Sequence, residues 1–307
     1  MASTPDTRRA IPLVCALWFI WSYNWVVVKE GLAFSGPFDF SALRCIFGSI
    51  IMFGALKILK KPLAPPPLTR TLLLGLFQTT GFLCLSSWAL VEGAVGKSAV
   101  LIYTFPFWTL LFAWLILGER IRGLQWAGVA LAGGGLTLVL EPWDLSGSLL
   151  SRVLAVLSGV SWAVSTIIAK QWRSRGDFDV LTVTAWQLLL GGLVCCAIAL
   201  AVPSKPVLWN GYFLLLIVAS GVIATAFGWL LWLFILKQLS AGVAGLGMMA
   251  VPALGILFSR LHYGEHFNRI ESAGMLLLAA SLGLLSWLNL RDRGRTPPGR
   301  LEQDTRL

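Results

Sequence analysis

The sequence contains few charged residues for its length. Asp, Glu, Lys and Arg make up 12% of its 307 residues, and 57% of the residues are hydrophobic. In soluble globular proteins about a quarter of the residues are charged. A soluble protein with so apolar a composition would still need polar faces on its helices, and the long apolar runs of this chain have none. The scarcity of charge therefore indicates a membrane protein.

Carboxylates are missing from the middle of every apolar run. All 14 Asp and Glu residues lie at the ends of runs, in the loops between them or in the tails. Proton-coupled transporters commonly place an ionisable side chain inside the membrane. The distribution therefore argues against a proton being exchanged at a site within the bilayer.

Signatures of enzyme chemistry are absent as well. The chain has no glycine-rich phosphate loop, and its five cysteines fit neither a disulfide framework nor a zinc site. His262 and His266 flank Glu265, but their order lacks the His-Glu start of a metalloprotease motif, and no third ligand is placed. We therefore predict no enzymatic activity, no cofactor and no metal site. A non-transport membrane enzyme, an assembly subunit and a channel remain alternatives.

What the sequence does contain is ten apolar runs. A membrane-spanning helix needs roughly 20 apolar residues. Helices are expected rather than strands, because backbone groups in lipid must be paired within their own segment and the alternation of barrel strands is not seen. The fold class predicted is an all-α membrane protein with ten transmembrane helices. The runs are 11–28, 39–57, 71–91, 97–117, 124–140, 153–172, 180–202, 211–236, 240–263 and 272–290.

The basic residues behind the net charge of +10 lie mainly in the connections between these runs and in the tails. With the amino terminus inside, the cytoplasmic loops and tails hold 17 of the 24 Lys and Arg residues, and the opposite side holds six. This positive-inside bias predicts that both termini are cytoplasmic. The basic excess then faces anionic lipid rather than nucleic acid, which we do not expect as a partner.

The two halves of the chain repeat each other. Trp21 and Lys29 recur 141 residues later, and a second group of residues recurs 146 residues later. Five runs per half mean that the second half enters the membrane in the opposite orientation, as in many transporters. We predict a tail over 1–10, five-helix repeats over 11–145 and 146–290, and a disordered cytoplasmic tail over 291–307. The second group pairs Gly75 with Gly221, Pro106 with Pro252, Gly118-Glu119 with Gly264-Glu265 and Ala127-Gly128 with Ala273-Gly274.

The ten short spans, the inverted repeat, the Trp in the first span of each half and the Gly-Glu after each fourth span resemble the drug/metabolite transporter superfamily. Within it, the chain is most similar to EamA-type exporters, and among these to the bacterial aromatic amino acid exporters. The resemblance covers about residues 10–290. It implies an exporter in the bacterial inner membrane with a central cavity lined by spans 1, 3, 4, 6, 8 and 9.

Polar and aromatic residues at mid-span are the candidates for contact with a solute, because such groups face a cavity or another helix rather than lipid. Trp and Tyr would stack on the solute, and the polar side chains would bond its polar end. Trp residues near span ends, Trp25 among them, are interpreted as interface anchors. Arg44 is the only charge deep in a span, and either a structural or a ligand-binding role is open. The predicted substrate-binding residues are Trp21, Asn24, Gln78, Tyr103, Trp162 and Ser165.

Pro106 and Pro252 are predicted hinges, because proline removes a backbone hydrogen bond and weakens a helix. Together these features predict an alternating-access transporter that exports small neutral or zwitterionic solutes, above all aromatic amino acids, without exchanging a proton at its site. Export of flat organic cations, drugs or nucleosides is the alternative. The expected partners are a small-molecule solute and the lipid bilayer, and the oligomeric state is not predicted.

Overall fold

The computed structural model describes residues 7–121, 123–143, 148–173, 179–238 and 250–295. Within these ranges every regular element is a helix, which confirms the all-α prediction for this part of the chain. The elements are α1 (Thr7–Gly31), α2 (Pro37–Ile58), α3 (Leu68–Leu74), η1 (Gly75–Gly81), α4 (Phe82–Glu92), α5 (Val95–Ile102), α6 (Phe105–Leu117), α7 (Gln125–Leu140), α8 (Leu149–Arg173), α9 (Val180–Ala201), α10 (Gly211–Ile217), η2 (Val218–Phe227), α11 (Gly228–Gln238), α13 (Ala250–Tyr263) and α14 (Arg269–Arg295).

Seven of the helical segments in the described ranges are long and apolar enough to span a membrane, and α7 is a shorter apolar helix. The chain is therefore a multi-pass membrane protein. The predicted run 240–263 lies partly outside the described residues, as do 1–6 and 296–307 of the predicted tails. Helices α1 and α14 extend into both predicted tails, beginning at Thr7 and ending at Arg295. The seven segments are Pro12–Gly31, Pro37–Ile58, Leu68–Glu92, Val95–Leu117, Leu149–Trp172, Val180–Ala201 and Gly211–Ile235.

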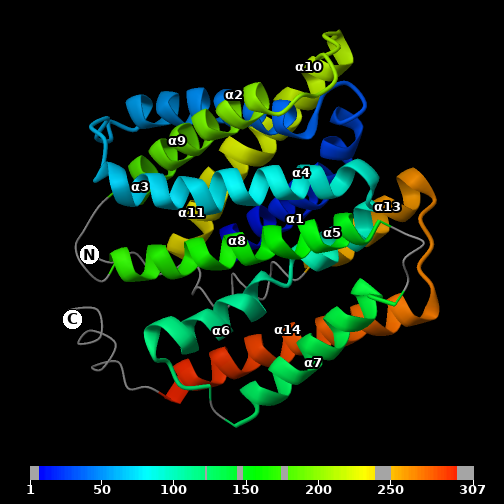
Figure 1. Ribbon diagram of the computed structural model, residues 1–307. Helices are drawn as coiled ribbons and strands as arrows, with labels where there is room; N and C mark the ends of the chain where they lie inside the picture. Colours follow the sequence, from blue (N-terminus) through cyan, green and yellow to red (C-terminus); the bar gives the residue numbers. More distant parts are fainter. Residues whose placement is uncertain (1–6, 122, 144–147, 174–178, 239–249, 296–307) are drawn as a thin grey trace.

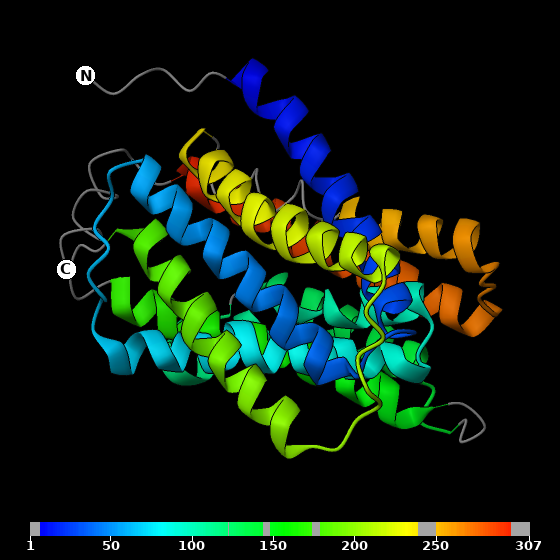
Figure 2. The same ribbon diagram turned by 90° about the horizontal axis from the view of Figure 1, so that it is seen from above.

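The helices run side by side between two ends of the bundle. Figures 1 and 2 place the connection between α2 and α3 at one end and the connection between α13 and α14 at the opposite end. In Figure 1, the connection between α6 and α7 lies at the left, at the same end as the α2–α3 connection. The connection between α4 and α5 lies at the right, at the same end as the α13–α14 connection. Alternate connections thus gather at opposite ends, as a multi-pass chain requires.

Small residues allow close contact between α7 and α14. A Cβ atom added to Gly135 would lie 2.8 Å from the carbonyl oxygen of Gly274, and one added to Gly274 would lie 2.8 Å from that of Gly135. Ser281 also donates a hydrogen bond of 2.7 Å to the carbonyl of Gly128. Gly135 of α7 and Gly274 of α14 therefore serve helix packing within lipid, where small residues let backbones approach. Figure 1 shows the pair lying together below α8.

Two π-helical segments occur at equivalent places in the two halves. η1 holds Gly75 and η2 holds Gly221, the pair that the repeat relates. Each glycine packs closely against the backbone of the second helix of the other half, Gly75 against α9 and Gly221 against α2. An added Cβ would lie 2.8 Å from the carbonyl oxygen of Gln187 in the first case and of Arg44 in the second. The equivalence was visible in the sequence, but the π geometry was not.

The fourth predicted span is broken in two. The sequence predicted one helix over 97–117, whereas α5 ends at Ile102 and α6 begins at Phe105. Pro106 lies in the first turn of α6, where a missing N–H is tolerated, but it cannot donate to the carbonyl of Ile102. Gly159 of α8 packs against that carbonyl, since a Cβ there would lie 2.6 Å from its oxygen.

Candidate functional site

A cavity of about 390 Å³ lies between helices of both halves. Its wall is built from α1, α2, α4, α8, α11, both π-helical segments and the break between α5 and α6. π-helical turns and helix breaks expose backbone groups that a regular helix would use internally, and they are common at functional sites. The irregular parts of the bundle therefore gather at this cavity.

The structure brings all six predicted substrate-binding residues to this one cavity, although they come from four elements of both halves. Whether they bind a solute stays a prediction. The cavity is lined by Trp21 and Asn24 from α1, Gln78 from η1, Tyr103 at the end of α5, and Trp162 and Ser165 from α8.

Aromatic rings form much of the wall. The ring centroid of Trp162 lies 4.7 Å from that of Phe82, 5.8 Å from that of Phe105 and 6.0 Å from that of Trp229. Trp21 lies 6.0 Å from Trp232. The indole N–H of Trp21 donates to the carbonyl of Ala224 in η2 at 3.0 Å, which fixes the ring. These tilted and edge-on contacts leave ring surface for a flat solute.

Several polar groups at the wall lack protein partners. The Oδ1 atom of Asn24 and the Nε1 atom of Trp25 are buried and have no hydrogen-bond partner in the described part of the chain. Ser165 is engaged differently, because its hydroxyl donates to the carbonyl of Trp162 at 2.7 Å, so it can offer a solute only its lone pairs. Buried polar groups are nearly always paired in proteins, so these two atoms are candidates for contact with a solute.

Trp25 was wrongly assigned to the membrane interface. It is 6% exposed and lines the cavity beside Phe82. Helix α1 continues to Gly31, which places Trp25 well inside the span. Because Trp21 and Trp25 are four residues apart, they share a helix face, and that spacing could have identified the residue from the sequence.

Arg44 is the residue whose role the sequence left open, and the structure places it at the cavity wall. Its Nη2 atom donates to Thr225 Oγ1 at 3.0 Å, and Thr225 in turn donates to the carbonyl of Ser220 at 2.8 Å. Among the described residues that line the cavity, none carries a carboxylate. The wall is therefore aromatic with one positive charge.

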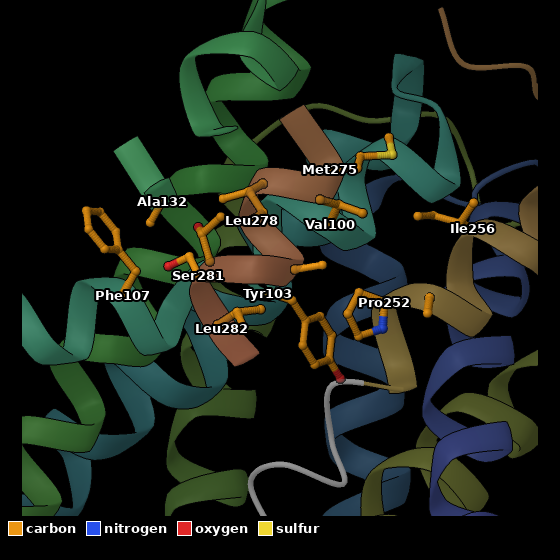
Figure 3. Close-up of a pocket in the computed structure, with 13 residues that line it drawn as sticks. Val100, Tyr103, Phe107, Ala132, Pro252, Ile256, Met275, Leu278, Ser281 and Leu282 are labelled. Carbon is orange, nitrogen blue, oxygen red and sulfur yellow. The ribbon is translucent and has the colours of Figure 1, made fainter. Parts of the chain in front are cut away.

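A second, smaller cavity of about 100 Å³ shares Tyr103 with the first. It is lined mainly by apolar side chains of α5, α6, α7, α13 and α14, including Pro252 and Met275. Figure 3 shows the ring of Tyr103 at its edge, next to Pro252. Tyr103 thus separates the main cavity from a space beside one predicted hinge.

Residues related by the repeat make different contacts at the two ends of the bundle. At the end that holds Glu265, this carboxylate accepts hydrogen bonds from the backbone N–H groups of Val95 at 2.7 Å and Gly96 at 3.0 Å. At the other end, the equivalent Glu119 instead pairs with Lys170, and their side chains are 48% and 56% exposed. We call these the Glu265 end and the Glu119 end.

Lys29, the counterpart of Lys170, closes the Glu265 end further. Its ammonium donates to the carbonyl groups at the end of α4, those of Leu90 at 2.6 Å, Val91 at 3.2 Å and Gly93 at 3.1 Å. Lysine at the carboxyl end of a helix also interacts favourably with the helix dipole. In this structure, therefore, the Glu265 end is tied together by residues of both halves.

A buried polar cluster ties the same end. Glu141 accepts hydrogen bonds from Asn268 at 2.9 Å and Lys97 at 3.1 Å, and Arg152 lies 3.8 Å away. Burial alone would raise the pKa of this carboxyl, but these donors and charges outweigh burial and hold the pKa below its ordinary value. His262 lies 3.5 Å from Glu30 nearby. Within the described ranges, no three His, Cys, Asp or Glu residues are placed to hold a metal ion.

Comparison with known proteins gives the family. The model of the EamA-like transporter family matches residues 8–141 and residues 149–287, which together are most of the chain. The chain belongs to the EamA-like transporter family. The resemblance drawn from the repeated motifs is thereby confirmed. The two predicted repeats, over 11–145 and 146–290, stay a prediction.

Two curated relatives of this EamA-like transporter carry transporter names. The "Uncharacterized transporter YoaV" of Bacillus subtilis is 27% identical, over 88% of this chain and 94% of its own length. A "Probable amino-acid metabolite efflux pump" of Escherichia coli is 24% identical, over 86% of this chain and 90% of its own. A crystal structure that is 19% identical covers 92% of this chain and 98% of its own, with a TM-score of 0.64, and shows the fold alone. The family moves small solutes across membranes, and these names indicate transporters rather than enzymes.

Proposed function

We propose that this EamA-like transporter exports small zwitterionic aromatic solutes, aromatic amino acids above all, by alternating access. The observation that carries the proposal is the cavity of about 390 Å³ between the two halves. It is walled by Trp21, Trp162, Trp229 and Trp232 and edged by polar groups that have no partner among the described residues. Its volume falls in the range of small-molecule sites. The relative named as an amino-acid metabolite efflux pump supports the same class of solute.

The proposed arrangement is ten transmembrane helices in two inverted five-helix repeats, in a bacterial inner membrane, with both termini in the cytoplasm. The positive-inside bias of the sequence supports the orientation, and it makes the Glu265 end the outer end. Inverted repeats with a site at their interface commonly form carriers whose halves rock around that site.

Alternating access is supported by the unequal ends. A carrier must close one end while the other admits solute. At the Glu265 end, Lys29 and Glu265 bond to backbone groups of neighbouring helices. At the Glu119 end, the equivalent pair, Lys170 and Glu119, bond to each other in an exposed position. Equivalent side chains thus make different contacts at the two ends, and a two-state device in which the ends exchange these contacts would alternate access.

The function is tested by uptake into proteoliposomes that contain the purified protein. The panel comprises aromatic amino acids, aliphatic amino acids, nucleosides and quaternary aromatic cations, with protein-free liposomes as the control. We expect saturable uptake of the aromatic amino acids alone. Saturable uptake of only the cations or nucleosides would replace this proposal with the alternative solute class, and unsaturable leakage of all solutes would indicate a channel.

A further inference from the structure

Arg44 is a buried cation inside an apolar helix. It lies two turns into α2, its residue is 5% exposed, and it contributes to the wall of the central cavity. An ionised side chain within a membrane is unfavourable unless it is paired, and it commonly marks a substrate or ion site. The presence of Arg44 at this wall therefore calls for a partner.

The protein itself satisfies little of the guanidinium group. The guanidinium group has five N–H donors. The described residues accept one hydrogen bond from it, that from Nη2 to Thr225 Oγ1 at 3.0 Å. The Nε atom is buried and has no partner among them. Among the described residues, no Asp or Glu lines the cavity beside Arg44, and the sequence has none between Asp39 and Glu92 or between Asp179 and Glu265.

Helix packing does not explain the charge. The contact between α2 and η2 is made backbone to backbone, since a Cβ on Gly221 would lie 2.8 Å from the carbonyl oxygen of Arg44. The equivalent contact in the other half has the same 2.8 Å between a Cβ on Gly75 and the carbonyl oxygen of Gln187. That position is neutral, and the packing there is as close. The guanidinium is therefore not required for this contact.

We propose that Arg44 binds the carboxylate of the transported solute, and that the cavity consequently discriminates against aromatic cations that lack an anionic group. This inference rests on the proposed function and names the feature of the solute that the site selects. A guanidinium matches a carboxylate through two parallel N–H···O bonds, and such charge-assisted pairs are strong in a site of low dielectric constant.

The remaining unpaired atoms of the wall complement the rest of a zwitterion. Asn24 Oδ1 is a buried acceptor without a partner among the described residues, and it can accept a hydrogen bond from the solute's ammonium group. The indole rings of Trp21 and Trp162 flank the same cavity and can hold the aromatic part. A carboxylate, an ammonium and a flat ring thus each have a matching group at one site.

The experiment compares tryptophan with tryptophan amide, whose carboxylate is replaced by a neutral amide. The protein is purified in detergent, and each ligand is titrated for half-maximal thermal stabilisation, since a ligand of the folded state raises the melting temperature. Uptake into proteoliposomes gives KM and kcat for each. We expect the wild type to bind the acid at least tenfold more tightly than the amide.

Variants at the same helix separate recognition from folding. Arg44→Gln introduces the residue found at the equivalent position of the other half, so the helix contact is retained. We expect it to weaken binding of the acid at least tenfold, to raise KM more than it lowers kcat, and to leave the amide within twofold of the wild type. Arg44→Lys should recover part of the loss. Lys57→Gln removes an exposed charge from the same helix and should behave as the wild type.

Three outcomes would overturn the proposal. The wild type would bind acid and amide equally; or Arg44→Gln would bind the acid as tightly as the wild type; or it would lose both ligands to the same degree, as a structural role requires. If Arg44→Gln does not fold, the wild-type comparison of acid with amide decides. If the wild type transports aromatic solutes equally well with and without a carboxylate, this inference alone is overturned. If the wild type transports no aromatic solute, the proposed function is overturned.

Discussion

At the scale of single residues, Trp21, Trp25 and Trp162 supply indole rings to the wall of the cavity. Trp21 and Trp162 were identified as candidates because the repeat relates them and they lie near mid-span, and both line the cavity. Trp25 was excluded because distance from the end of an apolar run was used as the measure of depth. Helix α1 extends beyond its apolar run of 11–28 and ends at Gly31. Depth is therefore better judged from helix faces, since Trp21, Asn24 and Trp25 follow the i, i+3, i+4 pattern of one face.

Trp162 is expected to stack on the solute. It lines the cavity and contacts Phe82, Phe105 and Trp229 edge-on or tilted, so a face of the indole is free for a ligand. Replacing Trp162 by Ala should lower solute affinity by about 1 kcal/mol, a several-fold rise in Kd. Trp162→Phe, which keeps a ring, should retain most of the affinity. Proteoliposome uptake measures the change.

The matched control is Trp126→Ala, because Trp126 is 46% exposed and does not line the cavity. Equal uptake by Trp162→Ala and the wild type, with equal amounts of protein in the membrane, would remove Trp162 from the site.

Glu141 is expected to stabilise the Glu265 end in a pH-dependent way. Its pKa is lower in the folded protein than in the unfolded chain, so its contribution is present above the ordinary pKa of Glu, about 4.3, and is lost as pH falls through the lowered value. Glu141→Gln should reduce the free energy of unfolding at pH 7 by about 1–3 kcal/mol, because charged hydrogen bonds from Lys97 and Asn268 are lost.

Thermal unfolding in detergent at a series of pH values measures this effect. The difference in melting temperature between wild type and Glu141→Gln should be greatest near neutral pH and shrink towards acid pH. Glu92→Gln, which removes an exposed carboxylate at the same end, should change little. A pH-independent difference would show that shape rather than charge matters at position 141.

At the scale of elements, the sequence located the helices well but not their irregularities. Apolar runs predict helix positions because each span must satisfy its own backbone groups. The π-helical turns of η1 and η2 and the break after Ile102 depend on contacts between helices, such as Gly75 against Gln187 and Gly159 against Ile102. A residue pattern within one helix carries no record of these contacts, so the cavity wall could not be drawn from the sequence.

Pro106 is expected to keep the break between α5 and α6 flexible. Replacing it by Ala restores an N–H group that can bond to the carbonyl of Ile102 and join the two helices. Pro106→Ala should therefore slow transport several-fold, with solute affinity within about twofold of the wild type. The initial rate of uptake at a saturating solute concentration measures the transport rate, and thermal stabilisation by the solute measures the affinity.

Pro37→Ala is the control, because Pro37 also lies in the first turn of a helix but begins a whole span rather than following a break within one. The same change at Pro252 tests the second predicted hinge. Unchanged rates in both Pro106→Ala and Pro252→Ala would mean that the prolines mark static bends, and the hinge prediction would be wrong.

At the scale of the whole molecule, the repeat was readable because a few residues recur at constant offsets, and the family model matches the chain twice. The departures from symmetry could not be read in this way. Arg44 faces η2 where Gln187 faces η1, and Lys29 and Lys170 make unrelated contacts. Because of these departures, the cavity wall carries the charge of Arg44 and the two ends of the bundle differ, which a symmetric pair of halves would not show.

The last prediction concerns what drives transport. The described residues that line the cavity include no carboxylate, histidine or lysine. No group there can exchange a proton with the solute, so solute should run down its own gradient in either direction. Uptake of an aromatic amino acid into proteoliposomes should reach the bath concentration and stop, with or without a pH gradient. Accumulation above the bath concentration only when the gradient is present would show proton coupling. Glu265 at the Glu265 end is then the first carboxylate to test, because it joins Val95 and Gly96 to the opposite half, and Glu265→Gln should abolish the accumulation if the proton passes through it.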